Sequence, residues 1–149
     1  MKSYQKIFNT HFLEMCKDVE YIFDNDWNIT KAVSFFELLM KTKPRLIFDY
    51  FKHYESIYHE ELKDDPYFFF VQHEYSQDLQ RENSSSLLEP IETFKKQLNT
   101  TSDTNKEKIR EYLTNLRQII ILDKKTESSE SSSSSSSSSS TQAFNNNST

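Results

Sequence analysis

The fold class of this chain follows most directly from residues 8–22, FNTHFLEMCKDVEYI. Apolar side chains recur in this stretch at steps of four, three, four and three residues, at Phe8, Phe12, Met15, Val19 and Ile22. Such steps place side chains on one face of an α-helix. The stretch predicts an amphipathic helix over about residues 3–23, in an all-α fold where helices pack against each other through their apolar faces.

The same spacing continues along the chain and predicts a compact bundle of five or six helices. The polar segment around Trp27 is expected to be a turn. The second helix is expected over residues 28–43 with Asn28 or Thr30 as N-cap, and the third over residues 44–62 with Pro44 in its first turn. The fourth is expected over residues 65–79, with Asp65 as N-cap and Pro66 next. A short helix over residues 87–98 follows, and the last helix, over residues 104–122, starts at a Thr104–Glu107 capping box.

Residues 67–71, YFFFV, also fit a short buried strand, because all five are apolar or aromatic. Asp65 and Pro66 before them form a typical helix start, and helical spacing continues to Leu79. The start signal and the length favour a helix.

The chain contains no glycine. Dinucleotide-binding turns, phosphate-binding loops, nucleophile elbows and EF-hand calcium loops all use glycine where the backbone takes positive φ or approaches a ligand closely. Helices can do without it. The composition therefore indicates a non-enzymatic helical domain and excludes these glycine-dependent sites.

The last 27 residues differ in composition from the rest. From Asp123 onward the only large apolar residue is Phe144, and serine is unbroken from Ser131 to Ser140. Such a segment lacks the apolar surface needed to order itself. We expect a helical domain over residues 1–122 and a disordered tail over residues 123–149, which serves as a phosphoacceptor, as a spacer, or as a tolerated low-complexity expansion.

Charge and cysteine content suggest the surroundings of the protein. Eighteen basic against 23 acidic residues leave a net charge of −5, which argues against nonspecific binding to nucleic acid. Cys16 is the only cysteine, so no intrachain disulfide can form, and we expect a buried thiol in a reducing compartment. No stretch looks like a signal peptide or a membrane span, so we expect an intracellular protein.

No cofactor or metal site is predicted. None of the four histidines follows a carboxylate at the spacing of di-iron bundles, and no HExxH occurs. Glu55 and His59 share a helix face at i, i+4, which would suit a metal ligand pair but is typical of a solvated helix pair. We therefore predict no catalytic residue.

Four basic residues form the best candidate for anion contact: Lys41, Lys43, Arg45 and Lys52. They surround the expected start of the third helix, where free N–H groups also favour an anion. The alternative is a solvated corner between helices, which the acidic charge of the whole chain favours.

Five aromatic residues form the candidate for partner binding: Phe68, Phe69, Phe70, Tyr54 and Tyr58. Three consecutive phenylalanines subtend most of a helix circumference, so at least one should face another element or a partner. The alternative is a wide core made of Phe and Tyr.

One resemblance covers about half of the chain, from Phe8 to Tyr75. It is carried by Phe12 with Asp18-Val19, by Pro44-Arg45 followed by Phe51 and Tyr58, and by Asp65 with Phe68-Phe69. These landmarks resemble a family of short uncharacterised helical proteins of large nucleocytoplasmic DNA viruses that infect protists. The resemblance implies packed helices, a location in host cytoplasm or virion, and no assigned activity.

Three functions remain open from the sequence. The first is a structural or adaptor protein that binds a protein partner, or a second copy of itself, through an aromatic helix face. The second is a nucleic-acid accessory protein that uses the local basic residues. The third is a helical groove that captures an amphipathic helix of a host protein.

Overall fold

The computed structural model describes residues 3–24, 26–81 and 85–136. These residues form an all-α bundle without strands, as predicted. The elements in chain order are α1 (Tyr4–Ile22), α2 (Trp27–Thr42), α3 (Leu46–Ile57), α4 (His59–Asp64), α5 (Pro66–Gln72), α6 (Ser76–Arg81), the short 3₁₀ helix η1 (Ser85–Leu87), α7 (Leu88–Asn99) and α8 (Asp103–Ser136).

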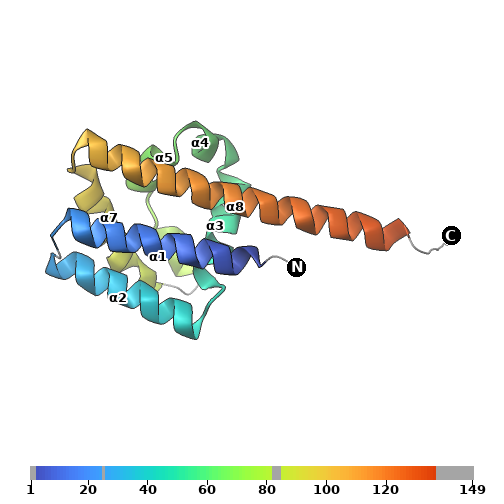
Figure 1. Ribbon diagram of the computed structural model, residues 1–149, viewed down its shortest axis with the longest axis horizontal. Helices are drawn as coiled ribbons and strands as arrows, with labels where there is room; N and C mark the ends of the chain where they lie inside the picture. Colours follow the sequence, from blue (N-terminus) through green and yellow to red (C-terminus); the bar gives the residue numbers. More distant parts are fainter. Residues whose placement is uncertain (1–2, 25, 82–84, 137–149) are drawn as a thin grey trace.

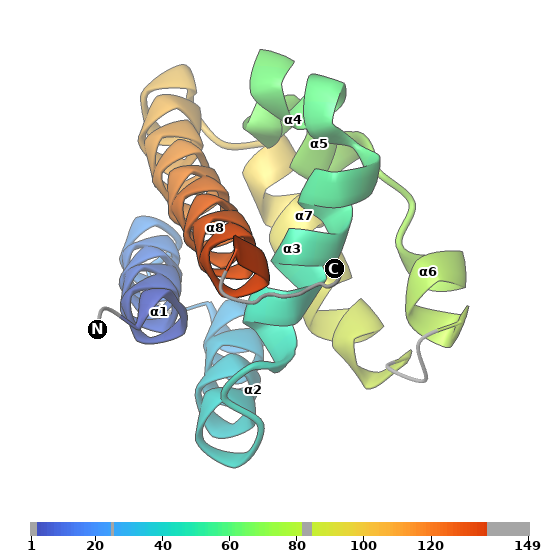
Figure 2. The same cartoon turned by 90° about the vertical axis from the view of Figure 1, so that its right-hand side faces the viewer.

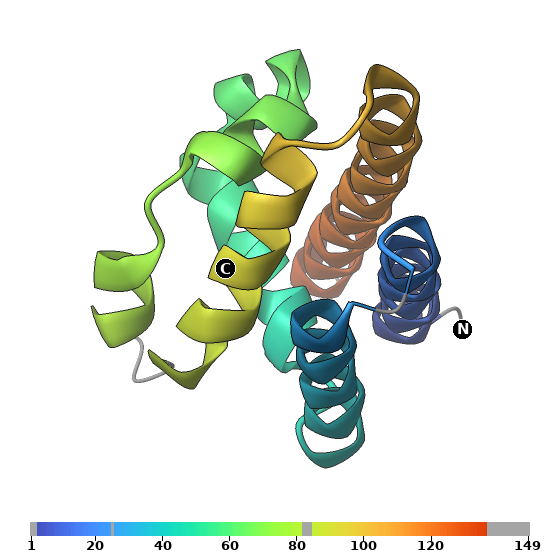
Figure 3. The same ribbon diagram turned by 90° about the vertical axis from the view of Figure 1, so that its left-hand side faces the viewer.

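The helices form two groups around one core. Helices α1, α2 and α8 lie side by side, with α8 antiparallel to α1 and projecting past the bundle (Figure 1). Helices α3, α5 and α7 cover the other side, and α6 lies at the edge (Figures 2 and 3). The apolar stripe predicted on the first helix points inward: Phe8, Phe12, Met15 and Val19 are buried and Ile22 is half-buried. Cys16 is buried, as predicted separately.

Two predicted helices are each broken in two. The helix expected over residues 44–62 starts at Leu46 and breaks at Tyr58. Pro44 lies before it, and its carbonyl oxygen accepts hydrogen bonds from the side chains of Gln5 and Asn9. Tyr58 leaves helical geometry where its ring packs 4.9 Å from the ring of Phe69. Packing between helices outweighs local helical periodicity here.

The helix expected over residues 65–79 begins as predicted, with Asp65 as N-cap and Pro66 as the first residue of α5. The strand alternative for residues 67–71 is therefore wrong. The helix ends at Gln72, because His73 adopts extended geometry. The chain turns there so that the Tyr75 hydroxyl donates to the Phe70 carbonyl at 3.2 Å.

Two predicted caps are also wrong by a few residues. Asp26 caps α2 in place of Asn28 or Thr30, because its carboxylate accepts from the backbone N–H groups of residues 28 and 29. Trp27 is consequently the first residue of α2 rather than part of a turn. At the start of α8, the Ser102 hydroxyl accepts from the N–H of Asn105 at 3.2 Å, in place of the expected Thr104 cap.

The turn between α1 and α2 takes a backbone conformation that usually requires glycine. Asp24 has φ of 54°, the only positive φ in the described residues. Aspartate tolerates this region better than most residues. In this glycine-free chain, an aspartate therefore occupies the one left-handed position found among the described residues.

Helix α8 does not end near Leu122 but continues to Ser136. No proline or glycine interrupts residues 103–136, and polar contacts hold the first turn beyond Leu122. Lys52 lies 2.9 Å from Asp123 and 3.1 Å from Glu127, and Lys124 donates to the Ser56 hydroxyl at 2.7 Å. Residues 137–149, where disorder is also expected, lie outside the described residues.

Candidate functional site

An aromatic cluster forms where α3 meets α5 and the segment after it. The ring of His73 stacks on Phe69 at 4.7 Å, with an interplanar angle of 20°. It meets Tyr75 edge to face at 4.7 Å and Tyr58 at 4.9 Å. The Tyr54 ring closes the cluster at 5.5 Å. The structure thus brings together three of the five predicted partner-binding residues, around a histidine that the sequence did not single out.

Hydrogen bonds fix His73 within this cluster. Its Nε2 donates to Asp78 at 2.8 Å, and the Tyr54 hydroxyl donates to the same carboxylate oxygen at 3.2 Å. Burial alone would raise the pKa of Asp78, but the bonds from His73 and Tyr54 outweigh it and hold that pKa below its ordinary value. Lys95 donates to the His73 carbonyl. These contacts hold α6 against α3 and α5.

The five aromatic candidates do not share one exposed face. Phe68 is 61% exposed on the outside of α5. Tyr54, Tyr58, Phe69 and Phe70 are only half-buried, but their rings pack inward, and Tyr54, Phe69 and Phe70 line the cavity described below. Of the predicted partner surface, only Phe68 presents most of its side chain to solvent.

The four basic candidates separate into two groups. Lys41, Lys43 and Arg45 are exposed at the end of α2 and in the turn before α3, and Arg45 pairs with Asp49 at 3.3 Å. Lys52 lies further along α3, where Asp123 and Glu127 of α8 hold it. Burial lowers the pKa of Lys52, but the two carboxylates outweigh that effect and raise it. Lys52 therefore helps to hold α3 against α8 through these two ion pairs.

The outer face of α2 is a feature that the sequence analysis did not identify. Trp27 is 74% exposed and Leu38 is 60% exposed. At 100° per residue they lie on the same side of the helix. The α2 outer face comprises Trp27, Lys31, Ser34, Leu38 and Lys41, all exposed. It lies opposite the buried face of Ile29, Ala32, Val33, Phe36 and Met40.

A signal for this face was present in the sequence. Leu38 falls two residues after Phe36 and two before Met40, so it lies off the apolar stripe that those residues define. Tyr21, which is 83% exposed, borders the same turn as Trp27. The one carboxylate in the middle of α2, that of Glu37, is engaged by Lys17 at 3.0 Å. The α2 outer face therefore combines two large apolar side chains with the exposed, positively charged side chains of Lys31 and Lys41.

Glu55 is the one buried charged residue among the described residues, at 4% exposure. Its carboxylate accepts from Arg117 Nε at 2.8 Å and from Arg117 Nη2 at 3.3 Å. His59 also bonds the carboxylate, as the i, i+4 spacing predicts. No group of three or more potential metal ligands is found in residues 3–24, 26–81 and 85–136. Glu55 here is the buried acidic partner of an ion pair whose arginine is partly exposed.

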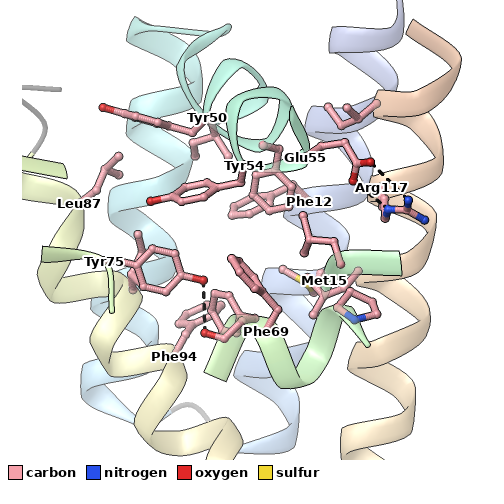
Figure 4. A pocket seen from close by; sticks show the side chains of 18 of the residues that line it. Phe12, Met15, Tyr50, Tyr54, Glu55, Phe69, Tyr75, Leu87, Phe94 and Arg117 are labelled. Carbon is pink, nitrogen blue, oxygen red and sulfur yellow. Dashed lines mark hydrogen bonds and ion pairs between the residues drawn. The ribbon is translucent and has the colours of Figure 1, made fainter. Parts of the chain in front are cut away.

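A cavity of about 110 Å³ lies in the middle of the bundle. Figure 4 shows Tyr50 and Leu87 at one end, and the Glu55–Arg117 pair at the other. The wall is almost entirely apolar and comes from most of the helices, with Phe12, Met15, Phe36, Tyr54, Phe69, Phe94 and Leu113 among its residues.

None of the helices in the described ranges combines the length and the apolar character that a bilayer span requires. The chain matches no protein family, no curated protein and no solved structure.

Proposed function

We propose that this chain is a protein-interaction domain that binds its partner through the α2 outer face. The supporting observation is the exposure of Trp27 and Leu38 on the side of α2 that faces away from the core. Tryptophan is among the residues that contribute most to binding at protein interfaces. Two large apolar side chains on the same exposed helix face suit a partner better than they suit water.

The chemistry of the face indicates the kind of partner. Trp27 and Leu38 are eleven residues apart, which corresponds to about 16 Å along the helix axis, or three turns. Lys31 lies between them and Lys41 lies about one turn beyond Leu38, so both add positive charge to the face. An amphipathic helix with acidic residues beside its apolar stripe would match both the length and the charge. The proposed partner presents such a helix, which would pack along α2.

The other two functions considered from the sequence receive less support. A cavity of about 110 Å³ is far too small for a helix, whose diameter with side chains is about 10 Å. In a basic site for nucleic acid, Lys52 is already engaged in the α3–α8 contact and Arg45 is paired with Asp49. Partner binding through the aromatic residues of α5 is reduced to Phe68.

The test is proximity labelling in expressing cells, read by mass spectrometry, with the full chain. The double variant Trp27→Ala/Leu38→Ala is compared with Phe68→Ala, which removes an equally exposed apolar side chain from another face. We expect a set of proteins that is lost in the double variant and retained in Phe68→Ala. The resemblance to giant-virus proteins makes host and viral proteins the first to examine. Equal labelling by all three chains would contradict the proposal, and loss only in Phe68→Ala would move the interface to α5.

A further inference from the structure

We propose that the internal cavity is a binding site for a small uncharged apolar molecule the size of a benzene ring. This site is independent of the α2 outer face, because its wall faces the core rather than solvent. The proposal rests on the chemistry of the wall, on the polar groups around it and on the size of the space.

Nine of the 22 residues that line the cavity carry aromatic rings, and several of these rings meet edge to face. Phe12 and Phe36 lie 5.3 Å apart at 87°, and Phe36 and Phe94 lie 5.5 Å apart at 84°. Tyr54 and Tyr75 lie 5.6 Å apart at 80°. Such a wall presents both ring faces and ring edges to the space (Figure 4). An aromatic guest can continue the same edge-to-face packing.

The two charged side chains of the wall and the hydroxyls of Tyr54 and Tyr75 are already paired within the protein. The Glu55 carboxylate is held by Arg117, and the Tyr75 hydroxyl donates to the Phe70 carbonyl. The Tyr54 hydroxyl donates to Asp78. Water would find few partners inside, so the space favours an apolar occupant. A charged ligand would lose its hydration without gaining a counter-ion, because the Glu55 and Arg117 side chains of the wall already pair with each other.

The size and access also fit such a ligand. An apolar cavity of about 150 Å³ in another protein stays dry and binds benzene, and the present cavity measures about 110 Å³. Tyr50 at one end is only half-buried, so this end of the cavity comes close to the surface. A single ring could enter there after a small movement of the Tyr50 side chain.

The test is a titration of the full chain with benzene and with benzoate, followed by NMR of the Leu, Ile and Met methyl groups. We expect benzene to shift the methyl signals of lining residues such as Met15 and Leu113, in a saturable way, and benzoate to leave them unchanged. Absence of a saturable shift up to the solubility of benzene would overturn the proposal. Equal binding of benzoate would also overturn it, since the only arginine among the described residues of the wall, Arg117, is already paired with Glu55.

A matched pair of substitutions locates the site. Leu113→Phe enlarges a side chain that lines the cavity, whereas Leu122→Phe makes the same change at an exposed position of the same helix, α8. We expect benzene to bind at least about tenfold more weakly to the first variant and unchanged to the second, a difference of about 1.4 kcal/mol. Equal binding by both variants would place benzene elsewhere. Diffraction from wild-type crystals under xenon pressure supplies a second test, which does not require the Leu113→Phe variant to fold. Xenon bound in the cavity would support the site, and a cavity without xenon would contradict it.

Discussion

Replacing Arg117 with Met should destabilise the bundle far more than replacing an arginine on its surface. Arg117 holds the Glu55 carboxylate, which is 4% exposed, through contacts of 2.8 and 3.3 Å. Arg117→Met keeps the aliphatic length of the side chain and removes only its charge and its donors. The variant therefore leaves a carboxylate in an apolar core without its guanidinium.

The size of the effect follows from the cost of an uncompensated buried charge. Removing one partner of a buried ion pair typically costs about 3–5 kcal/mol. His59 still bonds Glu55 and is half exposed, so it offers a partial replacement. We therefore expect about 3 kcal/mol, the lower end of that range. The double variant Glu55→Leu/Arg117→Met removes both charges and should lie within about 1 kcal/mol of the wild type.

The assay is urea unfolding at neutral pH, followed by far-ultraviolet circular dichroism. With a slope of about 2 kcal/mol per molar urea, the Arg117→Met midpoint should fall by about 1.5 M. Arg110→Met is the control, because Arg110 pairs with Asp65 at 33% exposure for both side chains, where such a pair contributes only about 1 kcal/mol or less. If the Arg117 variant loses no more than the control, or if the double variant is as unstable as the single one, the reasoning from buried charge is wrong.

Three further outcomes are expected. Hydrogen bonds from Arg110 and from backbone N–H groups outweigh burial and hold the pKa of Asp65 below its ordinary 3.8. Asp65 therefore stabilises the fold above that pH, and this contribution is lost as the pH falls through the lowered pKa. Between about pH 5 and pH 2, the free energy of unfolding should depend less on pH in Asp65→Asn than in the wild type, and an unchanged dependence would contradict this. Burial raises the pKa of the Cys16 thiol far above its usual range, so a thiol-reactive dye should label the chain only after urea unfolds it. Rapid labelling of the native chain would show that the buried face of α1, which contains Cys16, becomes exposed to solvent. A chain ending at Leu122 loses the contacts of Lys52 with α8 but should still unfold cooperatively, with a free energy of unfolding lower by about 1 kcal/mol or less. Loss of the cooperative transition would instead show that the domain extends beyond Leu122.

Most helices could be predicted from the sequence because the signals that start a helix and define its apolar face come from residues close together in the chain. The stripe of α1 and the Asp65–Pro66 start of α5 are local patterns, and both appear in the structure as expected. The breaks at Tyr58 and His73 could not be predicted in this way. They depend on rings that meet between α3 and α5, and helical spacing alone contains no information about such contacts.

The candidate sites show the same division. The outward position of Leu38 on α2 follows from helical spacing, so an analysis of the exposed side of each helix could have found it. The pairing of Glu55 with Arg117 joins residues 62 positions apart. Only the relative placement of α3 and α8 reveals it, and no spacing rule connects such distant residues.

The cavity is a consequence of the composition of the chain. Seven of the 23 buried hydrophobic residues of the core are large, rigid aromatic side chains, and the sequence supplies only two alanines and three methionines to fill the gaps between them. Protein interiors reach high packing density when small or flexible side chains fill the spaces that large ones leave. Met15 is the one methionine in the cavity wall. A core with many phenylalanines and tyrosines, few small residues and no glycine therefore tends to enclose space, and the same composition that favours helices leaves this bundle with an apolar cavity at its centre.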